Sequence, residues 1–375
     1  MNAELKSRMK EFRALVAEAI REEIAVQSGH FNNSSLGNAS PEKVLEVLLE
    51  YISRGKMIRG GLAMLSSEMY GFKGDERKTL ATALELIQSG FLIHDDIMDC
   101  DDIRRGKPAM HAYYKSKCTF SEPKVAQHYG VSMALCVGDL AFFMASSMIA
   151  RFSSHSSLVS HEKYSLSMLL HQELMRVALG QMQDIENGLS DTITSEDTVL
   201  AMYSWKTASY TFALPLKLGC LLACMHTSEI DEQFIEKECT TLSQLAYHLG
   251  ILFQLRDDEL GLHGDVATLG KSIGVDLVMH KDTVYLAKLH SKMSSEERFE
   301  YDALRGSARS DSKKMQSLVS FVQDLLTKYS IADEISALQN GHVMKARECI
   351  DILSVTKEYK ELLYGLADYV SARNK

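Results

Sequence analysis

The sequence predicts an all-α protein that folds as a single domain. Only four prolines occur among 375 residues, and helix interiors exclude proline. Apolar residues recur at helical spacing rather than in the alternation typical of a strand. No βαβ alternation, no repeat of solenoid length and no linker rich in Gly, Pro or Ser divides the chain. We therefore expect one all-α domain, residues 1–375, with a shared core.

Helical segments fill most of the chain. A first, highly charged helix precedes residues 30–40, which form a loop by composition. Ser40 and Pro41 mark the start of the next helix, as N-cap and first-turn residue. The further predicted helices are about 43–54, 60–70, 76–102, 124–152, 160–189, 195–224, 230–262, 281–291, 311–329 and 340–372.

Composition excludes several classes of protein. The net charge of −9 argues against a nucleic-acid partner. The seven cysteines are scattered without a C-x-x-C, so neither a zinc framework nor a disulfide scaffold is expected. The first twelve residues lack an apolar signal core, and no uninterrupted apolar run approaches transmembrane length. We expect reduced thiols and a cytoplasmic location.

An acidic segment ends the predicted helix 76–102. Asp95 and Asp99 are four residues apart, so both carboxylates leave one helical face, and Asp96 lies beside them. Carboxylates this close repel, so a positive group should lie between them. Mg²⁺ takes few carboxylates and completes its octahedron with water and phosphate oxygens. The segment predicts a metal bridge to a diphosphate; the alternative is a solvated acidic helix end.

Two features favour the metal bridge. Negative charge is disfavoured at the C-terminal end of an apolar helix, and a basic segment, RRGKP at 104–108, follows at once. A second acidic segment, DDELG at 257–261, ends another apolar helix later in the chain. Two such helix ends can face each other across a cleft and hold metal ions between them.

With these segments in place, the chain resembles the trans-prenyl diphosphate synthases over roughly residues 45–283. Gly60 stands where the family usually has proline, and Gly261 replaces the final aspartate of the second acidic motif. The matching motifs are DDxxD at Asp95–Asp99, RRG at Arg104–Gly106, GKxxR at Gly55–Arg59, GD at Gly138-Asp139, the pair Lys206-Thr207, and the late stretch Gly270–Asp276 with Lys281.

The resemblance implies a bundle of long antiparallel helices around a deep central cavity, and a homodimer. It implies a Mg²⁺-dependent, head-to-tail condensation of isopentenyl diphosphate with dimethylallyl, geranyl or farnesyl diphosphate, with three magnesium ions per site. The residues implied to bind metal are Asp95, Asp99 and Asp257, with Asp96, Asp258 and Asp276 near them. Those implied to hold the allylic diphosphate are Arg104, Lys206, Thr207, Gln254 and Lys271. Those implied to hold isopentenyl diphosphate are Lys56, Arg59, Gln88 and Arg105, with Lys281 as a further substrate contact.

The product length is expected to depend on residues one helical turn before the DDxxD motif. Gly90 and Phe91 lie five and four residues before Asp95. Glycine would open the floor of the cavity, and Phe91 would restrict it from the side. This favours a C20 product, geranylgeranyl diphosphate, over C15 farnesyl diphosphate; alternatively, Gly90 permits close helix packing.

Three other classes of protein share part of this pattern. A class I terpene cyclase shares an aspartate-rich helix end, but it has no need of the second diphosphate pocket that Lys56, Arg59 and Arg105 suggest. A non-catalytic regulatory subunit would have lost its aspartate motifs, which are present here. A structural helical bundle leaves the ordered basic motifs unexplained. Residues 291–375 carry no chemical motif and are expected to complete the bundle.

Overall fold

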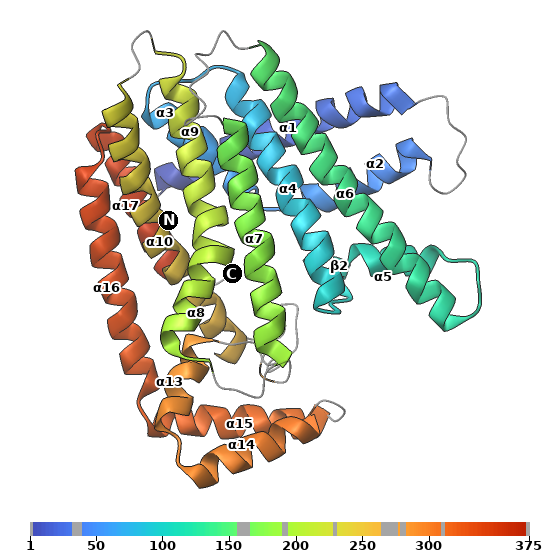
Figure 1. The fold of residues 1–375 in the computed structure, drawn as a ribbon, viewed down its shortest axis with the longest axis vertical. Helices are drawn as coiled ribbons and strands as arrows, with labels where there is room; N and C mark the ends of the chain where they lie inside the picture. The colour runs from blue at the N-terminus through green and yellow to red at the C-terminus, as the bar shows by residue number, and fades with distance from the viewer. Residues whose placement is uncertain are drawn as a thin grey trace. The chain divides into compact units, whose positions relative to one another are not determined.

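The computed structural model describes residues 3–31, 40–155, 166–189, 194–227, 231–263, 277, 283–308 and 312–372. Nearly all of these residues are helical, which confirms the predicted all-α class (Figure 1). The chain divides into two compact units. Each unit is described by itself below, and the single domain that the sequence suggests stays a prediction.

The N-terminal unit comprises Lys6–Met168 and Pro215–Asp231. Helix α4 is its central element and packs against α3 and α6, while α5 packs on α6. Helix α9 is fastened to α3, because the Ser66 hydroxyl donates to the Leu216 carbonyl at 2.5 Å. The elements that lie wholly or mainly in this unit are α1 (Ala3–Phe31), α2 (Pro41–Ser53), α3 (Ile58–Met69), α4 (Glu76–Met98), β1 (Ile103–Arg104), β2 (Lys107–Pro108), α5 (Met110–Lys117), α6 (Pro123–His155) and α9 (Leu214–Cys224).

Two glycines allow α4 and α6 to cross closely. An ideal Cβ at Gly90 on α4 would lie 2.9 Å from ring carbons of Phe142 and 3.0 Å from the Gly138 carbonyl oxygen on α6. A Cβ at Gly138 would collide with the His94 ring of α4. The glycines therefore serve the packing of these helices, since any side chain would push them apart.

A two-stranded hairpin follows α4. Helix α4 ends at Met98, four residues earlier than predicted, and Asp99 is its C-cap. Cys100 then takes a left-handed conformation, with φ of 55°, which ends the helix. Strands β1 and β2 pair Ile103 with Pro108 and Arg104 with Lys107. Arg105 and Gly106 have φ of 54° and 72°, as a two-residue hairpin turn of this kind requires.

The C-terminal unit comprises Met1–Leu5, Leu169–Leu214 and Glu232–Lys375. Helix α10 packs against η3, α16 and α17, and α14 pairs with α15 (Figure 1). Its core includes Tyr203, Ile251 and Leu255, each at most 4% exposed. The elements wholly or mainly in this unit are α7 (Leu166–Leu189), α8 (Glu196–Tyr203), η3 (Ser204–Ala213), α10 (Glu232–His263), α13 (Val284–Lys292), α14 (Ser295–Ala308), α15 (Ser312–Lys328), α16 (Ile331–Ile352) and α17 (Lys357–Ala372).

The segment predicted as one helix over 195–224 contains a π-helical stretch, η3. The Leu214 N–H donates to the carbonyl of Ser209, five residues back. Pro215 supplies the reason: it has no N–H for the carbonyl four residues back, and its ring crowds that carbonyl. The wider turn accommodates both defects. Such stretches are frequent at functional positions, and this one carries Lys206 and Thr207.

The remaining helix predictions differ from the structure in three ways. Helices α5 and α14 were not predicted. The segment predicted over 340–372 is divided into α16 and α17, and α16 begins at Ile331, nine residues earlier than predicted. By length and composition alone, residues 123–151 and 196–224 could each cross a membrane, although the second stretch is almost wholly buried inside the protein. A buried core helix passes the same test.

Candidate active site

The first acidic cluster lies at the end of α4. Asp95 and Asp96 occupy its last turn, and the Asp99 N–H donates to the Asp95 carbonyl at 2.8 Å. Helical spacing therefore persists through the C-cap, and Asp95 and Asp99 are neighbours one turn apart. Asp95 is half-buried, with its side chain 27% exposed, whereas Asp96 is fully buried.

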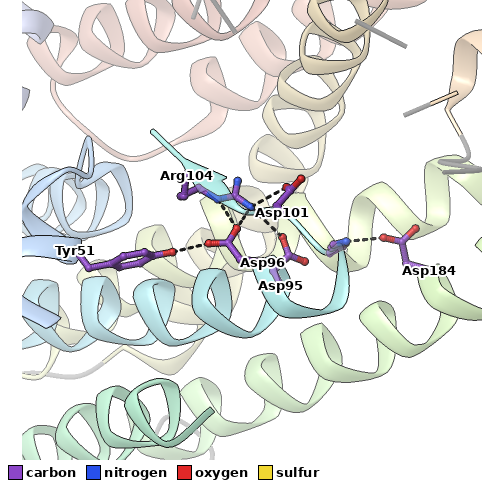
Figure 2. A network of polar contacts seen from close by, with 7 residues as sticks. Tyr51, Asp95, Asp96, Asp101, Arg104 and Asp184 are labelled. Atoms are coloured by element: carbon purple, nitrogen blue, oxygen red, sulfur yellow. Dashed lines mark hydrogen bonds and ion pairs between the residues drawn. The ribbon is translucent and has the colours of Figure 1, made fainter. Parts of the chain in front are cut away.

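Asp96 is held from two directions (Figure 2). The Tyr51 hydroxyl of α2 donates to its Oδ2 at 3.0 Å, and Arg104 Nε of β1 donates to its Oδ1 at 2.6 Å. Burial raises the pKa of the Asp96 carboxyl, against the opposing effect of the Arg104 and Tyr51 hydrogen bonds. Asp96 is therefore a buried anchor, with its oxygens already committed to protein donors.

Arg104 supplies the positive charge that this cluster needs. Besides Asp96, its Nη2 lies 3.5 Å from Asp101 Oδ2 and 4.0 Å from Asp95 Oδ2. Figure 2 shows one guanidinium serving all three carboxylates. The spacing of these acids predicts a positive group between them, and in this structure the guanidinium of Arg104, from the following hairpin, lies there.

The donor chemistry of the cluster fits a hard divalent cation. Asp95 and Asp99 offer carboxylate oxygens at the end of a helix, the ligand type that Mg²⁺ prefers. Within the described ranges, no three His, Cys, Asp or Glu side chains gather as a complete metal site. Mg²⁺ commonly takes one or two carboxylates and fills its shell with water and substrate phosphate. The cluster fits that type of site.

The hairpin directs its two arginines to different places. Arg104 pairs with Asp96, whereas Arg105 lies over Gly55, where an ideal Cβ would be 3.0 Å from Arg105 Nη1. Gly55 precedes Lys56, which is exposed. Glycine thus permits the guanidinium to approach the backbone beside a second basic residue, Lys56, and Arg105 and Lys56 form a second cationic locus.

Arg59 and Gln88 lie on α3 and α4 of the same unit. Arg59 is the second residue of α3, two positions after the left-handed N-cap residue Met57, whose φ is 54°. Both Arg59 and Gln88 are half-buried. Gly60, the departure from the family's proline, donates its N–H to the buried Glu85 of α4 at 2.8 Å.

The second acidic cluster lies inside α10, which continues past it to His263 rather than ending there. Asp258 is buried, at 8% exposure, and accepts from the Tyr203 hydroxyl and from Gln254 Nε2 at 3.0 Å. Gln254 Oε1 in turn accepts from the Thr207 hydroxyl at 3.1 Å. Asp257 is half-buried beside Asp258. Gln254 and Thr207, predicted separately, are thus joined to this cluster.

Lys206 of η3 has a carboxylate partner that the sequence did not reveal. Its Nζ lies 2.5 Å from Asp184 Oδ2 of α7; Figure 2 includes Asp184. The Lys206 side chain is 28% exposed and that of Asp184 is 15% exposed. The ion pair holds the ammonium in place at the π-helical stretch while leaving it partly accessible.

The two clusters share one design. In each Asp-Asp pair the second aspartate is buried and accepts a tyrosine hydroxyl, from Tyr51 in one and Tyr203 in the other. The first aspartate of each pair, Asp95 or Asp257, is half-buried. Helical geometry explains the division, since consecutive residues point about 100° apart around the axis. Lys271, Asp276 and Lys281 lie outside the described residues.

Gly90 and Phe91 lie against α6. The Phe142 ring occupies the position beside Gly90, and it meets the Phe91 ring edge-to-face at a centroid distance of 5.0 Å. Both Phe91 and Phe142 are half-buried. The role of Gly90 in close helix packing therefore has direct support, and its role in chain length stays a prediction.

Acidic pairs on helices, each with cationic side chains on the same unit, define the class of this protein: an all-helical enzyme for a phosphorylated substrate. Comparison with known sequences specifies the class. The chain belongs to the polyprenyl synthetase family, whose model matches residues 42–322. It is accordingly a prenyltransferase, a trans-prenyl diphosphate synthase.

The similar proteins span several product lengths. A short chain isoprenyl diphosphate synthase of Methanothermobacter thermautotrophicus is 29% identical over 340 residues, covering 90% of this chain and 93% of the relative. A geranylgeranyl diphosphate synthase of Sulfolobus acidocaldarius is 28% identical over 333 residues, covering 87% and 89%. Other relatives are named for geranylfarnesyl and octaprenyl products. The relatives therefore support the reaction and leave the length of its product open.

A solved structure agrees with the fold. The geranylgeranyl pyrophosphate synthase of Corynebacterium glutamicum, solved with isoprenyl diphosphate and magnesium, superimposes with a TM-score of 0.82. The two chains are 25% identical, and the match covers 97% of this chain and 99% of the other. The predicted isoprenoid-synthase type of helical fold is thereby confirmed.

Proposed function

We propose that this protein makes geranylgeranyl diphosphate, C20, by Mg²⁺-dependent head-to-tail addition of isopentenyl diphosphate to an allylic diphosphate. A relative named for this product and a solved neighbour that holds magnesium and isoprenyl diphosphate support the proposal. The alternative product is C15 farnesyl diphosphate. A non-catalytic regulatory subunit is disfavoured, because both acidic pairs are present.

The observation that carries the proposal is the division of the hairpin arginines. Arg104 is committed to the acidic cluster, and Arg105 lies over Gly55 beside Lys56. A condensing synthase needs separate cationic sites for two diphosphates, whereas a terpene cyclase needs one. Two loci carried by adjacent residues of one hairpin fit the synthase.

The proposed residue roles follow this division. Carboxylates bind metal, cations beside the acidic pairs hold the leaving diphosphate, and cations around Gly55 hold the second substrate. The assignments are Asp95, Asp99 and Asp257 for metal; Arg104, Lys206, Thr207, Gln254 and Lys271 for the allylic diphosphate; Lys56, Arg59, Gln88 and Arg105 for isopentenyl diphosphate; and Lys281 for a further substrate contact. Asp96 and Asp258 hold their neighbours in position through hydrogen bonds with Arg104, Tyr51, Gln254 and Tyr203.

These residues suit a reaction that starts by ionisation. Bound Mg²⁺, proposed as three ions, would neutralise the negative charge that grows on the departing diphosphate. Lys206 and Arg104 add fixed positive charge for the same group. Arg105, Arg59 and Lys56 hold isopentenyl diphosphate so that its double bond can attack the allylic cation. The carbon–oxygen bond to the leaving diphosphate breaks first, the double bond then attacks the cation to form the new carbon–carbon bond, and the departed diphosphate accepts the proton released from the isopentenyl carbon.

A homodimer in the cytoplasm is also proposed. Helix α6 is long and apolar, and the large apolar side chains that it exposes include Leu135 at 41% and Phe143 at 71%. Both lie within residues 133–148, an apolar run of this helix that we propose as part of the interface. Burial of this face against a second copy would remove apolar surface from water. The molar mass in dilute solution, measured by light scattering, tests the dimer; a monomer at micromolar concentration contradicts it.

The product length is proposed to depend on Gly90 and Phe91. A Gly90→Phe substitution should shorten the product, and an unchanged length rejects Gly90 as part of the floor. Because Phe142 fills the position beside Gly90, the same substitution should be compared in a Phe142→Leu background. A shortened product in that background, with native stability, separates a pocket effect from helix displacement.

The test of the activity uses purified protein, labelled isopentenyl diphosphate and each of dimethylallyl, geranyl and farnesyl diphosphate, with Mg²⁺ or with EDTA. We expect C20 alcohol after dephosphorylation from all three starters. It should form in the samples with Mg²⁺ and not in those with EDTA. If C15 alcohol is the end product, the condensation reaction stands and the proposed C20 product is wrong. Absence of any condensation product contradicts the proposed activity.

A further inference from the structure

Glu85 of α4 is a buried acid that the proposed mechanism does not use. Its side chain is 5% exposed, and a buried carboxyl group requires polar partners to offset its desolvation. Its Oε1 accepts the Gly60 N–H at 2.8 Å. Burial raises the pKa of Glu85, while the N–H groups of Gly60 and Arg59 and the guanidinium charges of Arg59 and Arg105 act in the opposite direction.

The partners of Glu85 lie at the start of α3. The first N–H groups of a helix have no acceptor within that helix. Met57, the N-cap residue, makes no side-chain cap and is left-handed. Glu85 reaches across from α4 and accepts from Gly60, the third residue of α3. Glu85 thereby satisfies a free N–H group in the first turn of α3, as an N-cap side chain usually does, although it belongs to a neighbouring helix.

The residue at position 60 matches this role. An ideal Cβ there would lie 3.0 Å from the Ala81 carbonyl oxygen and 3.2 Å from Glu85 Cγ, so glycine permits the close approach of α3 and α4. A proline would have no N–H to donate. Gly60 and Glu85 therefore work as a matched pair, which accounts for the glycine at this position of the GKxxR segment.

The capped turn carries the cations assigned to isopentenyl diphosphate. Arg59 precedes Gly60 directly, and Arg105 lies over Gly55 four residues before Arg59. The charges of both guanidinium groups act on the Glu85 carboxyl and lower its pKa against the effect of burial. We infer that Glu85 is a positioning residue that fixes the first turn of α3, and with it Arg59 and Arg105, to receive isopentenyl diphosphate. This inference rests on the proposed function.

The N-terminal unit offers a matched control. Glu68 lies at the other end of α3, is 6% exposed, and pairs with Arg8 and Arg77. Like Glu85, it is a buried acid of this unit influenced by arginine charges, but none of its hydrogen bonds and ion pairs with the described residues reaches the Gly55–Gly60 segment. A general effect of removing a buried acid should appear in Glu68→Gln as well, and an effect on substrate positioning should not.

The experiment measures KM for isopentenyl diphosphate and for geranyl diphosphate in wild type, Glu85→Gln and Glu68→Gln. Glu85→Gln keeps an acceptor for Gly60 but loses the charge, so we expect KM for isopentenyl diphosphate to rise about tenfold. KM for geranyl diphosphate should change by less than about twofold, and kcat at saturation should be retained. Glu68→Gln should leave both KM values near those of wild type.

A second variant keeps the test decisive if Glu85→Gln folds poorly. Gly60→Ala retains the carboxylate and the N–H but separates them, and it should produce the same selective rise in KM. If the wild type is active but both KM values change equally, or neither changes, the positioning role of Glu85 is overturned and the proposed function still stands. A wild type that forms no product overturns the proposed function, and the positioning role with it.

Discussion

The crossing of α4 and α6 makes a quantitative prediction for Gly90→Ala. The added Cβ would lie 2.9 Å from Phe142 ring carbons, at least about 0.5 Å inside ordinary van der Waals contact. Overpacking of this kind costs roughly 1–3 kcal/mol, whereas the better helix propensity of alanine returns up to about 1 kcal/mol. We expect a net loss of roughly 1–2 kcal/mol in the free energy of unfolding.

A double-mutant cycle isolates that contact. In a Phe142→Leu background the ring is gone and only the 3.0 Å approach to the Gly138 carbonyl oxygen remains, so Gly90→Ala should cost about 1 kcal/mol less than in wild type, a coupling free energy of about 1 kcal/mol. Urea unfolding of the four proteins, with comparison of midpoints at equal m-values, provides the measurement. Additivity within about 0.5 kcal/mol would refute the packing argument.

Three further predictions concern the buried polar groups. Tyr203→Phe removes one donor to the buried aspartate of the second cluster and should lower the unfolding free energy by about 1–3 kcal/mol; a change below about 0.5 kcal/mol in urea midpoints contradicts this. Burial lowers the pKa values of His248 and His342 to about 4; the His248 charge adds to the shift at His342, and Lys345 adds to both. The unfolded chain therefore binds more protons, and stability should fall as pH drops from about 6.5 towards 4. His342→Gln should flatten that slope; an equal slope in the variant is the contrary result. Arg104→Gln should lower Tm in EDTA, because it removes the cation between three carboxylates, and Mg²⁺ should narrow the gap to wild type; a gap unaffected by Mg²⁺ argues against metal at this cluster.

The sequence predicts the all-α class because that class depends on local signals. Proline scarcity and helical periodicity act within each segment, and the resulting helices α2, α4, α6 and α10 lie close to their predicted ranges. The end of α4 was placed too late because acidic residues carry no strong stop signal. The actual stop is the left-handed Cys100, a conformation that side-chain type alone does not specify.

In the candidate site, the residues that local spacing predicts differ from those that only the fold brings together. Asp95 and Asp99 can be recognised from their spacing, because a helix turns that spacing into proximity. Tyr51 contacts Asp96 across 45 positions of sequence, and Tyr203 contacts Asp258 across 55. A single tyrosine in an amphipathic helix gives no sign of such a distant partner. These anchors therefore emerge from packing alone.

Glu85 and Asp184 were missed for a related reason. Each is one acid in a helix of mixed composition, and its importance depends on a backbone N–H or an ammonium from another element. An acidic side chain in a helix is usually solvated. Burial distinguishes the few that are not, and burial is a property of the fold rather than of the local sequence.

The central claim is that the chain holds two diphosphates with two separate sets of cations. The most direct test is the pair of KM values, for isopentenyl and for geranyl diphosphate, in Arg105→Gln and in Lys206→Gln. The account predicts that Arg105→Gln raises KM for isopentenyl diphosphate alone and that Lys206→Gln raises KM for geranyl diphosphate alone, each by about tenfold or more. Equal effects of both substitutions on both substrates would contradict it.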